Sequence, residues 1–351
     1  MSTLRYLKSA AAVLAVALVL GACDHDELVG PPNTLSEQRA HAGTATISDA
    51  NVVEVIARHD GPDYVFDLSD DVIPSGWTTF ELDNRSGATH FVYTARLPEA
   101  AIAGAREDGV PLLEYWDEHV VRPIQYTVDL GLPDKEPDPL DLSEKYHDTV
   151  LPPWLFDAAP VGGPGFLQGH LSSRTTVYLE PGYYVLECYV KNAEEDLHSY
   201  HEMVALLEVK DEPSGAPEPR ASLEVNLSTG QIDVDPDIRP GLHTVAVHFE
   251  DQTTYQPLQG HDVHLIRLDG WTARETVEWM DPTVPGGMVS ADGMRGPTTF
   301  LGGTQTATAG STVYVTVRLE PGEYAWVAEV PVEEEMWETF TVPHGTPTGS
   351  R

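Results

Sequence analysis

The chain is patterned as short β-strands in which every second residue is apolar. Alternation of this kind is typical of strands that bury one face. Turn sequences such as Pro74-Ser75-Gly76 and Pro181-Gly182 separate the runs. The pattern predicts an all-β fold from Val52 onward. The residues that share strand faces are Tyr64, Phe66 and Leu68; Phe91, Tyr93, Ala95 and Leu97; Val177 and Leu179; Tyr184, Leu186, Cys188 and Val190; and Met203, Ala205, Leu207 and Val209.

The alternation is interrupted between about residues 99 and 165. Apolar and aromatic residues there recur at helical spacing, and an acidic, proline-rich stretch follows over residues 133–141. We therefore expect one large, partly helical insertion within the first domain. The residues with helical spacing are Leu112, Leu113, Tyr115, Trp116, His119 and Val120.

The second half of the chain repeats the first. Residues 177–184 match residues 317–324 at an offset of 140 (317 minus 177), and Gly162-Gly163 matches Gly302-Gly303 at the same offset. Residues 90–97 likewise match residues 261–268. Ordered matches of this kind predict two copies of one fold. We place the first domain at residues 44–211, a linker at 212–220, the second domain at 221–342 with a shorter insertion, and a tail at 343–351.

The N-terminus has the features of a secretion signal. Arg5 and Lys8 precede an apolar stretch at residues 10–20 that is too short to span a bilayer comfortably. The sequence Leu20-Gly21-Ala22-Cys23 resembles a bacterial lipobox, in which the cysteine is lipidated. We expect a signal peptide at 1–22 and a lipidated tether at 23–43 that anchors the protein in the cell envelope, facing the periplasm or the exterior. The sequence leaves open an ordinary signal peptide that carries a cysteine, and which membrane holds the anchor.

The charge of the chain narrows the classes of partner. It has 56 acidic residues against 20 Lys and Arg, a formal net charge of −36. This excess argues against nucleic-acid binding, which needs clustered Lys and Arg, and favours a partner with a basic docking face. The sequence carries no phosphate-binding glycine loop, no His-Glu-x-x-His and no Gly-x-Ser-x-Gly. We therefore expect no enzymatic activity.

The chain has only two cysteines, Cys23 and Cys188. If Cys23 is lipidated, Cys188 has no partner for an intrachain disulfide, although disulfides usually form outside the cytoplasm. A lone thiol in that compartment is open to oxidation unless it is buried or bound to a metal.

The residues that accompany Cys188 in the sequence favour a thiol that is bound to a metal. His198 and Met203 follow it with the spacing Cys-x9-His-x4-Met, and His90 lies on a strand far upstream. One thiolate, two imidazoles and a weak thioether form the ligand set of a type 1 copper site. We predict one copper in the first domain, with His201 as a rival of His198. The same residues also fit a fold without metal, in which Cys188 and Met203 fill the core.

These motifs resemble the cupredoxin superfamily, the plastocyanin-like blue copper proteins, twice over. The resemblance implies two Greek-key β-sandwich domains in tandem and gives ligand roles to His90, Cys188, His198 and Met203. The loop between Cys188 and His198 is longer than the loop usual in plastocyanins and azurins. More narrowly, several segments resemble bacterial cupredoxin-like envelope proteins: residues 73–80, 89–91, 96–98, 162–165, 179–182 and 187–191.

The second repeat differs at the decisive position, because Ala328 stands where Cys188 stands in the first. Without a thiolate, no blue copper site can form there. His261 corresponds to His90, and His264 lies nearby; we expect both to be satisfied or exposed strand residues. The second repeat is expected to serve as a structural or docking partner.

Three functions fit the sequence. The first is a lipid-anchored protein of the cell envelope that carries single electrons between redox partners. The second is a metal-free binding or structural module, and the third is a protein that buffers or delivers copper. The sequence leaves open the redox partner, the potential and the oligomeric state.

Overall fold

The structure is a computed structural model that describes residues 51–344, apart from residues 62, 132–150, 236–237, 254–259, 283, 295, 297 and 330–333. The predicted signal peptide, Cys23, the tether and nearly all of the tail lie outside the described residues. In the part that is described, no helix combines the length and the apolar character needed to cross a bilayer.

The first repeat folds as a β-sandwich. One of its sheets has the strand order β2-β1-β3-β6 and the other β5-β4-β7-β8. Strand β3 joins the two sheets, because residues 72–75 pair with β8 and residues 76–83 pair with β6. The strands are β1 (Val52–Asp60), β2 (Asp63–Leu68), β3 (Val72–Asn84), β4 (Tyr93–Arg96), β5 (Ala159–Gly162), β6 (Ser172–Leu179), β7 (Gly182–Glu187) and β8 (Val204–Pro213).

The second repeat reproduces this order strand for strand. Its sheets are β10-β9-β11-β14 and β13-β12-β15-β16, and each strand takes the place of the strand numbered eight lower in the first repeat. The predicted duplication of a β-sandwich is therefore confirmed. The strands are β9 (Leu223–Ser228), β10 (Gln231–Val234), β11 (Gly241–Phe249), β12 (Val263–Arg267), β13 (Thr299–Thr304), β14 (Thr312–Leu319), β15 (Gly322–Val327) and β16 (Trp337–Val342).

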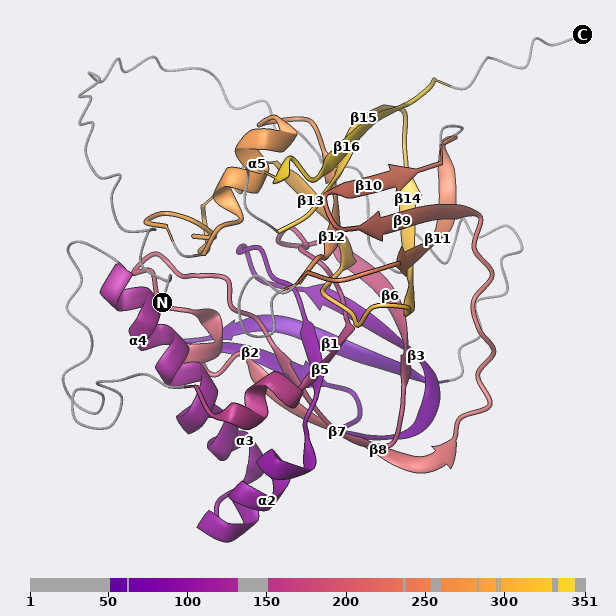
Figure 1. Cartoon of the computed structure of the whole chain (residues 1–351). Coiled ribbons are helices and arrows are strands. Elements are labelled where there is room, and N and C mark those ends of the chain that lie inside the picture. Colours follow the sequence, from indigo (N-terminus) through magenta and orange to yellow (C-terminus); the bar gives the residue numbers. More distant parts are fainter. Residues whose placement is uncertain are drawn as a thin grey trace, which may run out of the picture. The chain divides into compact units, whose positions relative to one another are not determined.

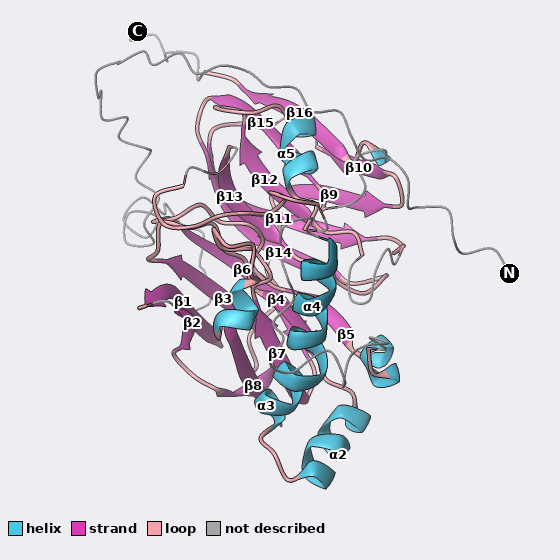
Figure 2. Cartoon of the chain, turned by 90° about the vertical axis from the view of Figure 1, so that its left-hand side faces the viewer, coloured by secondary structure: helices cyan, strands magenta, loops and turns pink. Residues whose placement is uncertain are grey.

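An approximate two-fold axis relates the repeats. Strands β6 and β14 pair antiparallel, and the central pair joins Thr175 to Val315, two residues separated by the repeat offset of 140 (315 minus 175). A second antiparallel contact pairs Pro164 with Thr304, again 140 apart (304 minus 164). When equivalent residues face each other, the repeats meet as the halves of an isologous dimer do. Figure 2 shows β6 and β14 side by side where the two sets of strands meet.

The junction contains a buried ion pair. Arg174 of β6 lies 2.7 Å from a Glu81 carboxylate oxygen of β3, and both side chains are almost completely buried. Beside them the Thr175 hydroxyl donates to the backbone carbonyl of Gly303, 3.0 Å away in the second repeat. Buried charges are tolerated only when paired, so this pair helps to fix how the strands of the junction meet.

The predicted insertion is partly helical, and the end of its predicted range, up to about residue 165, contains the sandwich strand β5. Its helices lie together beside the first repeat (Figure 1). The single helical stretch expected around residues 112–120 is divided, because a π-helical turn follows one and a half turns of α-helix. Among the described residues of the second repeat, the short helix α5 lies at the corresponding place. The helices are α2 (Glu99–Asp108), α3 (Leu112–Trp116), η1 (Asp117–Val121), α4 (Arg122–Gly131), η2 (Pro153–Asp157), η3 (His198–His201) and α5 (Ala273–Trp279).

The buried pair gives a test of the fold. Replacing Arg174 by Ala leaves the Glu81 carboxylate buried without its cation, which should lower the free energy of unfolding by about 3–5 kcal/mol. The double variant Arg174→Met/Glu81→Met should recover most of that loss. Urea unfolding measures both. An Arg174→Ala variant as stable as one altered at the exposed Arg106 would show that the pair is unimportant.

Candidate metal centre

His90 is fixed in the core between two strands. Its backbone forms two hydrogen bonds with Leu167, at 3.1 and 2.7 Å, and its side chain is completely buried. The Ser86 hydroxyl donates to Asn84 Oδ1 at 2.9 Å and lies 2.8 Å from His90 Nε2. Because the hydroxyl hydrogen is used on Asn84, Ser86 accepts from His90 Nε2–H. The lone pair of His90 is therefore on Nδ1.

Backbone hydrogen bonds connect the segments that carry Cys188, His198 and Met203. Cys188 directly follows β7, and its N–H donates to the Met203 carbonyl at 3.2 Å. His198 begins the η3 turn, its N–H donates to Val190, and its own carbonyl accepts from Met203 N–H at 3.0 Å. The side chains of Cys188, His198 and Met203 are completely buried.

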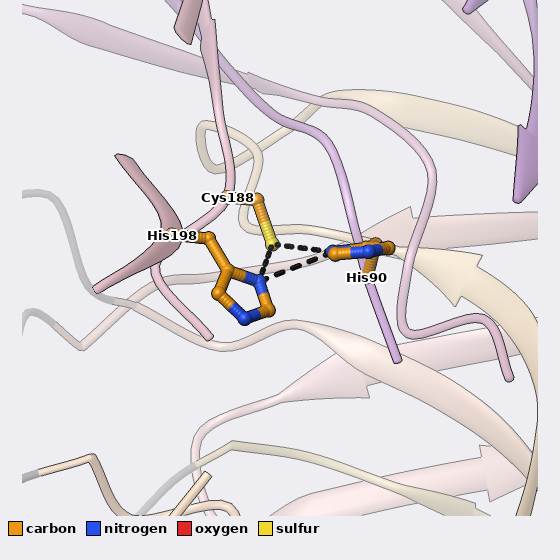
Figure 3. A group of neighbouring side chains, drawn as sticks. All are labelled: His90, Cys188 and His198. Carbon is orange, nitrogen blue, oxygen red and sulfur yellow. Dashed lines mark hydrogen bonds between the residues drawn. The ribbon is translucent and has the colours of Figure 1, made fainter. Parts of the chain in front are cut away.

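Three potential ligand atoms converge (Figure 3). Cys188 Sγ lies 3.7 Å from His90 Nδ1 and 3.8 Å from His198 Nδ1, and the two nitrogens are 3.1 Å apart. A triangle with these sides has a centre about 2.1 Å from all three corners, which equals a metal–nitrogen bond and is within about 0.2 Å of a metal–sulfur bond. The gap between the three side chains therefore fits one metal ion.

Hydrogen bonds at the outer edges of the rings aim both imidazoles inward. His198 Nε2 lies 3.2 Å from the Ser290 carbonyl oxygen. A carbonyl only accepts, so Nε2 carries the proton and the lone pair is on Nδ1, as in His90. Two nitrogen lone pairs and one thiol thus face a single point.

Burial keeps all three groups uncharged when no metal is bound. It lowers the pKa of His90 to about 3 and that of His198 well below its usual value, and it raises the pKa of the Cys188 thiol to about 12. Neutral imidazoles are ready to bind a metal, whereas the thiol must first lose its proton.

Met203 and His201 occupy different environments. Met203 is held beside the cluster by its backbone bonds to Cys188 and His198, and its axial role remains a prediction. His201 lies outside the cluster and is partly exposed, and its Nε2 is 3.1 Å from Asp196 Oδ2. The structure therefore brings His90, Cys188 and His198 together and leaves His201 aside.

The long loop between Cys188 and His198 is held from two directions. The Gln125 side chain of α4 accepts from Leu197 N–H at 2.7 Å. The completely buried Lys191 ammonium donates to Glu195 and to the carbonyls of Pro282 and Val284 in the second repeat, each at 3.1 Å. Although this loop is longer than the loop usual in plastocyanins and azurins, hydrogen bonds from α4 and from the second repeat constrain it.

The second repeat contains a different group of buried polar side chains near the junction between the repeats. Ala328 is completely buried, and Asp262, His264 and Glu329 form a second buried group. His264 Nδ1 accepts from Phe166 N–H at 3.1 Å, and its Nε2 lies 2.8 Å from Asp262 Oδ2. Both ring nitrogens are therefore used in hydrogen bonds, and no thiolate is present in this group.

Sequence reasoning missed the residues that support the ligands. Ser86, Gln125 and Ser290 contact the ligands or their loop, but none belongs to a recognisable motif.

Comparison with known proteins gives matches in structure alone. No family model and no curated protein matches the chain. The reduced auracyanin of Roseiflexus castenholzii covers 46% of this chain and 97% of its own, at 19% identity and a TM-score of 0.23. A blue copper oxidase of Nitrosomonas europaea covers 80% of this chain and 79% of its own, at 11% identity and a TM-score of 0.20. The copper nitrite reductase of Nitrosomonas europaea covers 86% and 96%, at 11% identity and a TM-score of 0.21.

The strand order is the same in both repeats, and His90, Cys188 and His198 converge in the first. The chain consists of two copies of one β-sandwich, which is the architecture that the cupredoxin resemblance of its sequence implies. The group that combines a thiol with two imidazoles, His90, Cys188 and His198, lies in the first copy.

Copper binding should release one proton. The Cys188 thiol, with its pKa at about 12, is protonated at pH 8, while His90 and His198 are already neutral. The neighbouring buried Glu187, with its pKa raised to about 7, is mostly ionised at that pH. Affinity for Cu(I) should therefore rise by about tenfold per pH unit.

A pH indicator in weakly buffered solution, with Cu(I) added to residues 24–351, measures this release. The Cys188→Ser variant is the control and should release no proton. Equal release from the variant would contradict the assignment of the proton to the thiol.

Proposed function

We propose that this protein is a single-electron carrier with one type 1 copper site in its first repeat. The observation that carries the proposal is the convergence of one sulfur and two nitrogens around a point about 2.1 Å from each. Cys188 would provide the thiolate through which the electron passes, His90 and His198 the two nitrogens, and Met203 the weak axial ligand.

The residues around the centre would keep its geometry constant. Each imidazole is fixed by a hydrogen bond at its outer nitrogen, to Ser86 or to Ser290. Tyr64 also stacks on the His198 ring, with 3.8 Å between the ring centroids. Ligands held in this way change position little when the metal changes charge, which favours rapid electron transfer.

Burial favours a carrier over an enzyme. Catalytic metal sites keep a coordination position open to substrate. Here the side chains of His90, Cys188 and His198 are completely buried, and they leave a substrate no direct approach. Complete burial likewise suits a retained copper better than one that is delivered elsewhere.

We also propose the surroundings in which the carrier works. Lipidation at Cys23 would hold it in the cell envelope, within reach of membrane-associated redox partners. The net charge of −36 would attract a partner with a basic docking face.

Replacing Cys188 by Ser tests the electron path. The substitution conserves size, so the fold should persist, while the strong visible thiolate-to-copper absorption and reversible one-electron voltammetry should both be lost. His201→Ala is a matched control, because His201 lies near the site but outside the cluster. Undiminished electron transfer by the Cys188→Ser variant would rule out this mechanism.

If electrostatic attraction guides the partner to this acidic protein, salt should change the rates of electron transfer to a cationic and to an anionic partner in opposite directions. Oxidation of the reduced protein by a cationic redox protein should slow as ionic strength rises, because salt screens the attraction. Oxidation by an anionic protein of similar potential should accelerate. Stopped-flow rates between about 10 and 200 mM salt measure both, and the same trend for the two partners would contradict electrostatic steering.

A further inference from the structure

A segment of the second repeat lies against the ligand loops of the first. This segment, residues 284–292 and called the cap below, belongs to the connection between α5 and β13. It forms a short backbone ladder with Lys191: Lys191 N–H donates to the Met288 carbonyl at 3.0 Å, and Ser290 N–H donates to the Lys191 carbonyl at 2.8 Å. The Ser290 carbonyl then accepts from His198 Nε2–H at 3.2 Å.

The cap is also bonded to the loop that carries His90. Ser290 Oγ accepts from Thr89 N–H at 2.8 Å. Asp292 accepts from Gly87 N–H at 2.5 Å, and its other carboxylate oxygen lies 2.6 Å from His59 Nδ1. The cap therefore bridges the His90 loop and the Cys188–His198 loop, two parts of the first repeat that are far apart in the sequence.

The His198 ring is enclosed as a result. Tyr64 covers one face, the Ser290 carbonyl occupies the outer edge, and Nδ1 points toward Cys188. The imidazole is completely buried, although it lies on a loop near the end of the sandwich. Without the cap, the outer nitrogen would lose its acceptor.

We propose that the cap of the second repeat completes the copper site of the first by holding His198 in its metal-binding orientation and excluding water and small ligands. This inference rests on the proposed copper site. It gives the second repeat, which lacks the cysteine ligand, a role in the chemistry of the first. A hydrogen bond to the outer nitrogen of a metal-binding histidine fixes its tautomer and its orientation, and losing such support typically costs 10–100-fold in metal affinity.

The double variant Ser290→Ala/Asp292→Ala tests the proposal, because it removes the side-chain bonds that attach the cap to the His90 loop. The matched control is Asp251→Ala. Asp251 is also an exposed aspartate of the second repeat that accepts a backbone N–H, from Thr229 at 2.6 Å, but it follows β11 and takes no part in the cap. The single variant Ser290→Ala is a milder form if the double variant folds poorly.

The first readout is the rate at which an excess of a chelator removes Cu(I). Removal should be about 10–100-fold faster from the double variant than from the wild type. The Asp251→Ala control should match the wild type. Equal rates in all the variants would overturn the proposal.

The second readout needs no metal. In nuclear magnetic resonance spectra of the metal-free protein, the His198 Nε2–H should exchange slowly with solvent in the wild type and the control, and quickly in the double variant. Equal exchange would overturn the proposal.

Failure of the electron-carrier function would be seen separately, as wild-type copper that does not cycle between Cu(I) and Cu(II). If the wild type bound no copper, the proposed copper site would be wrong, and with it the role of the cap in completing that site.

Discussion

The convergence of two imidazole lone pairs and one thiol on a single buried point is the constraint on which the rest of the structure depends. The three atoms that face one another, Cys188 Sγ and the two Nδ1 atoms, have one proton among them, carried by the thiol, so they satisfy one another only in part. A cation at their centre satisfies all three. Each outer nitrogen, buried in turn, has an acceptor in Ser86 or Ser290, because an unmade hydrogen bond in the core costs about 1–3 kcal/mol. The helices of the first repeat and the cap of the second then hold the loops that carry these groups.

Duplication has conserved the scaffold while the chemistry has diverged. Thr175 pairs with its own equivalent, Val315, so the repeats associate as two copies of one protein would. At the position of Cys188 the second copy has Ala328, and its buried polar group is an Asp–His pair with Glu329. Its connection between α5 and β13 contacts the first copy's ligand loops. The two halves therefore contribute different parts of one centre.

Much of the fold could be predicted from the sequence, because its signals are local or periodic. Alternation predicted the strands, and the offset of 140 predicted the repeat, whereas the pairing of Thr175 with Val315 across the repeats came from the structure alone. Cys188, His198 and the distant His90 were predicted as a group because Cys188 is a lone thiol if Cys23 is lipidated, and because a thiolate, two imidazoles and a thioether form a copper ligand set. The cap could not be predicted, since Ser290 contacts His198 through a backbone carbonyl, which any residue provides. The sequence also does not show that Lys191 is completely buried, because its ammonium donates to the carbonyls of Pro282 and Val284, which lie 91 and 93 residues away in the chain. Lipidation at Cys23 remains a prediction.

The most direct test of the central claim is a titration of residues 24–351 with Cu(II), followed by the visible absorption spectrum and a copper count. The account predicts one copper per chain with intense thiolate-to-copper absorption, because Cys188 Sγ and the two Nδ1 atoms surround a single position. Copper bound without that absorption would contradict the type 1 site and favour a copper-handling role. No bound copper would contradict the metal centre altogether.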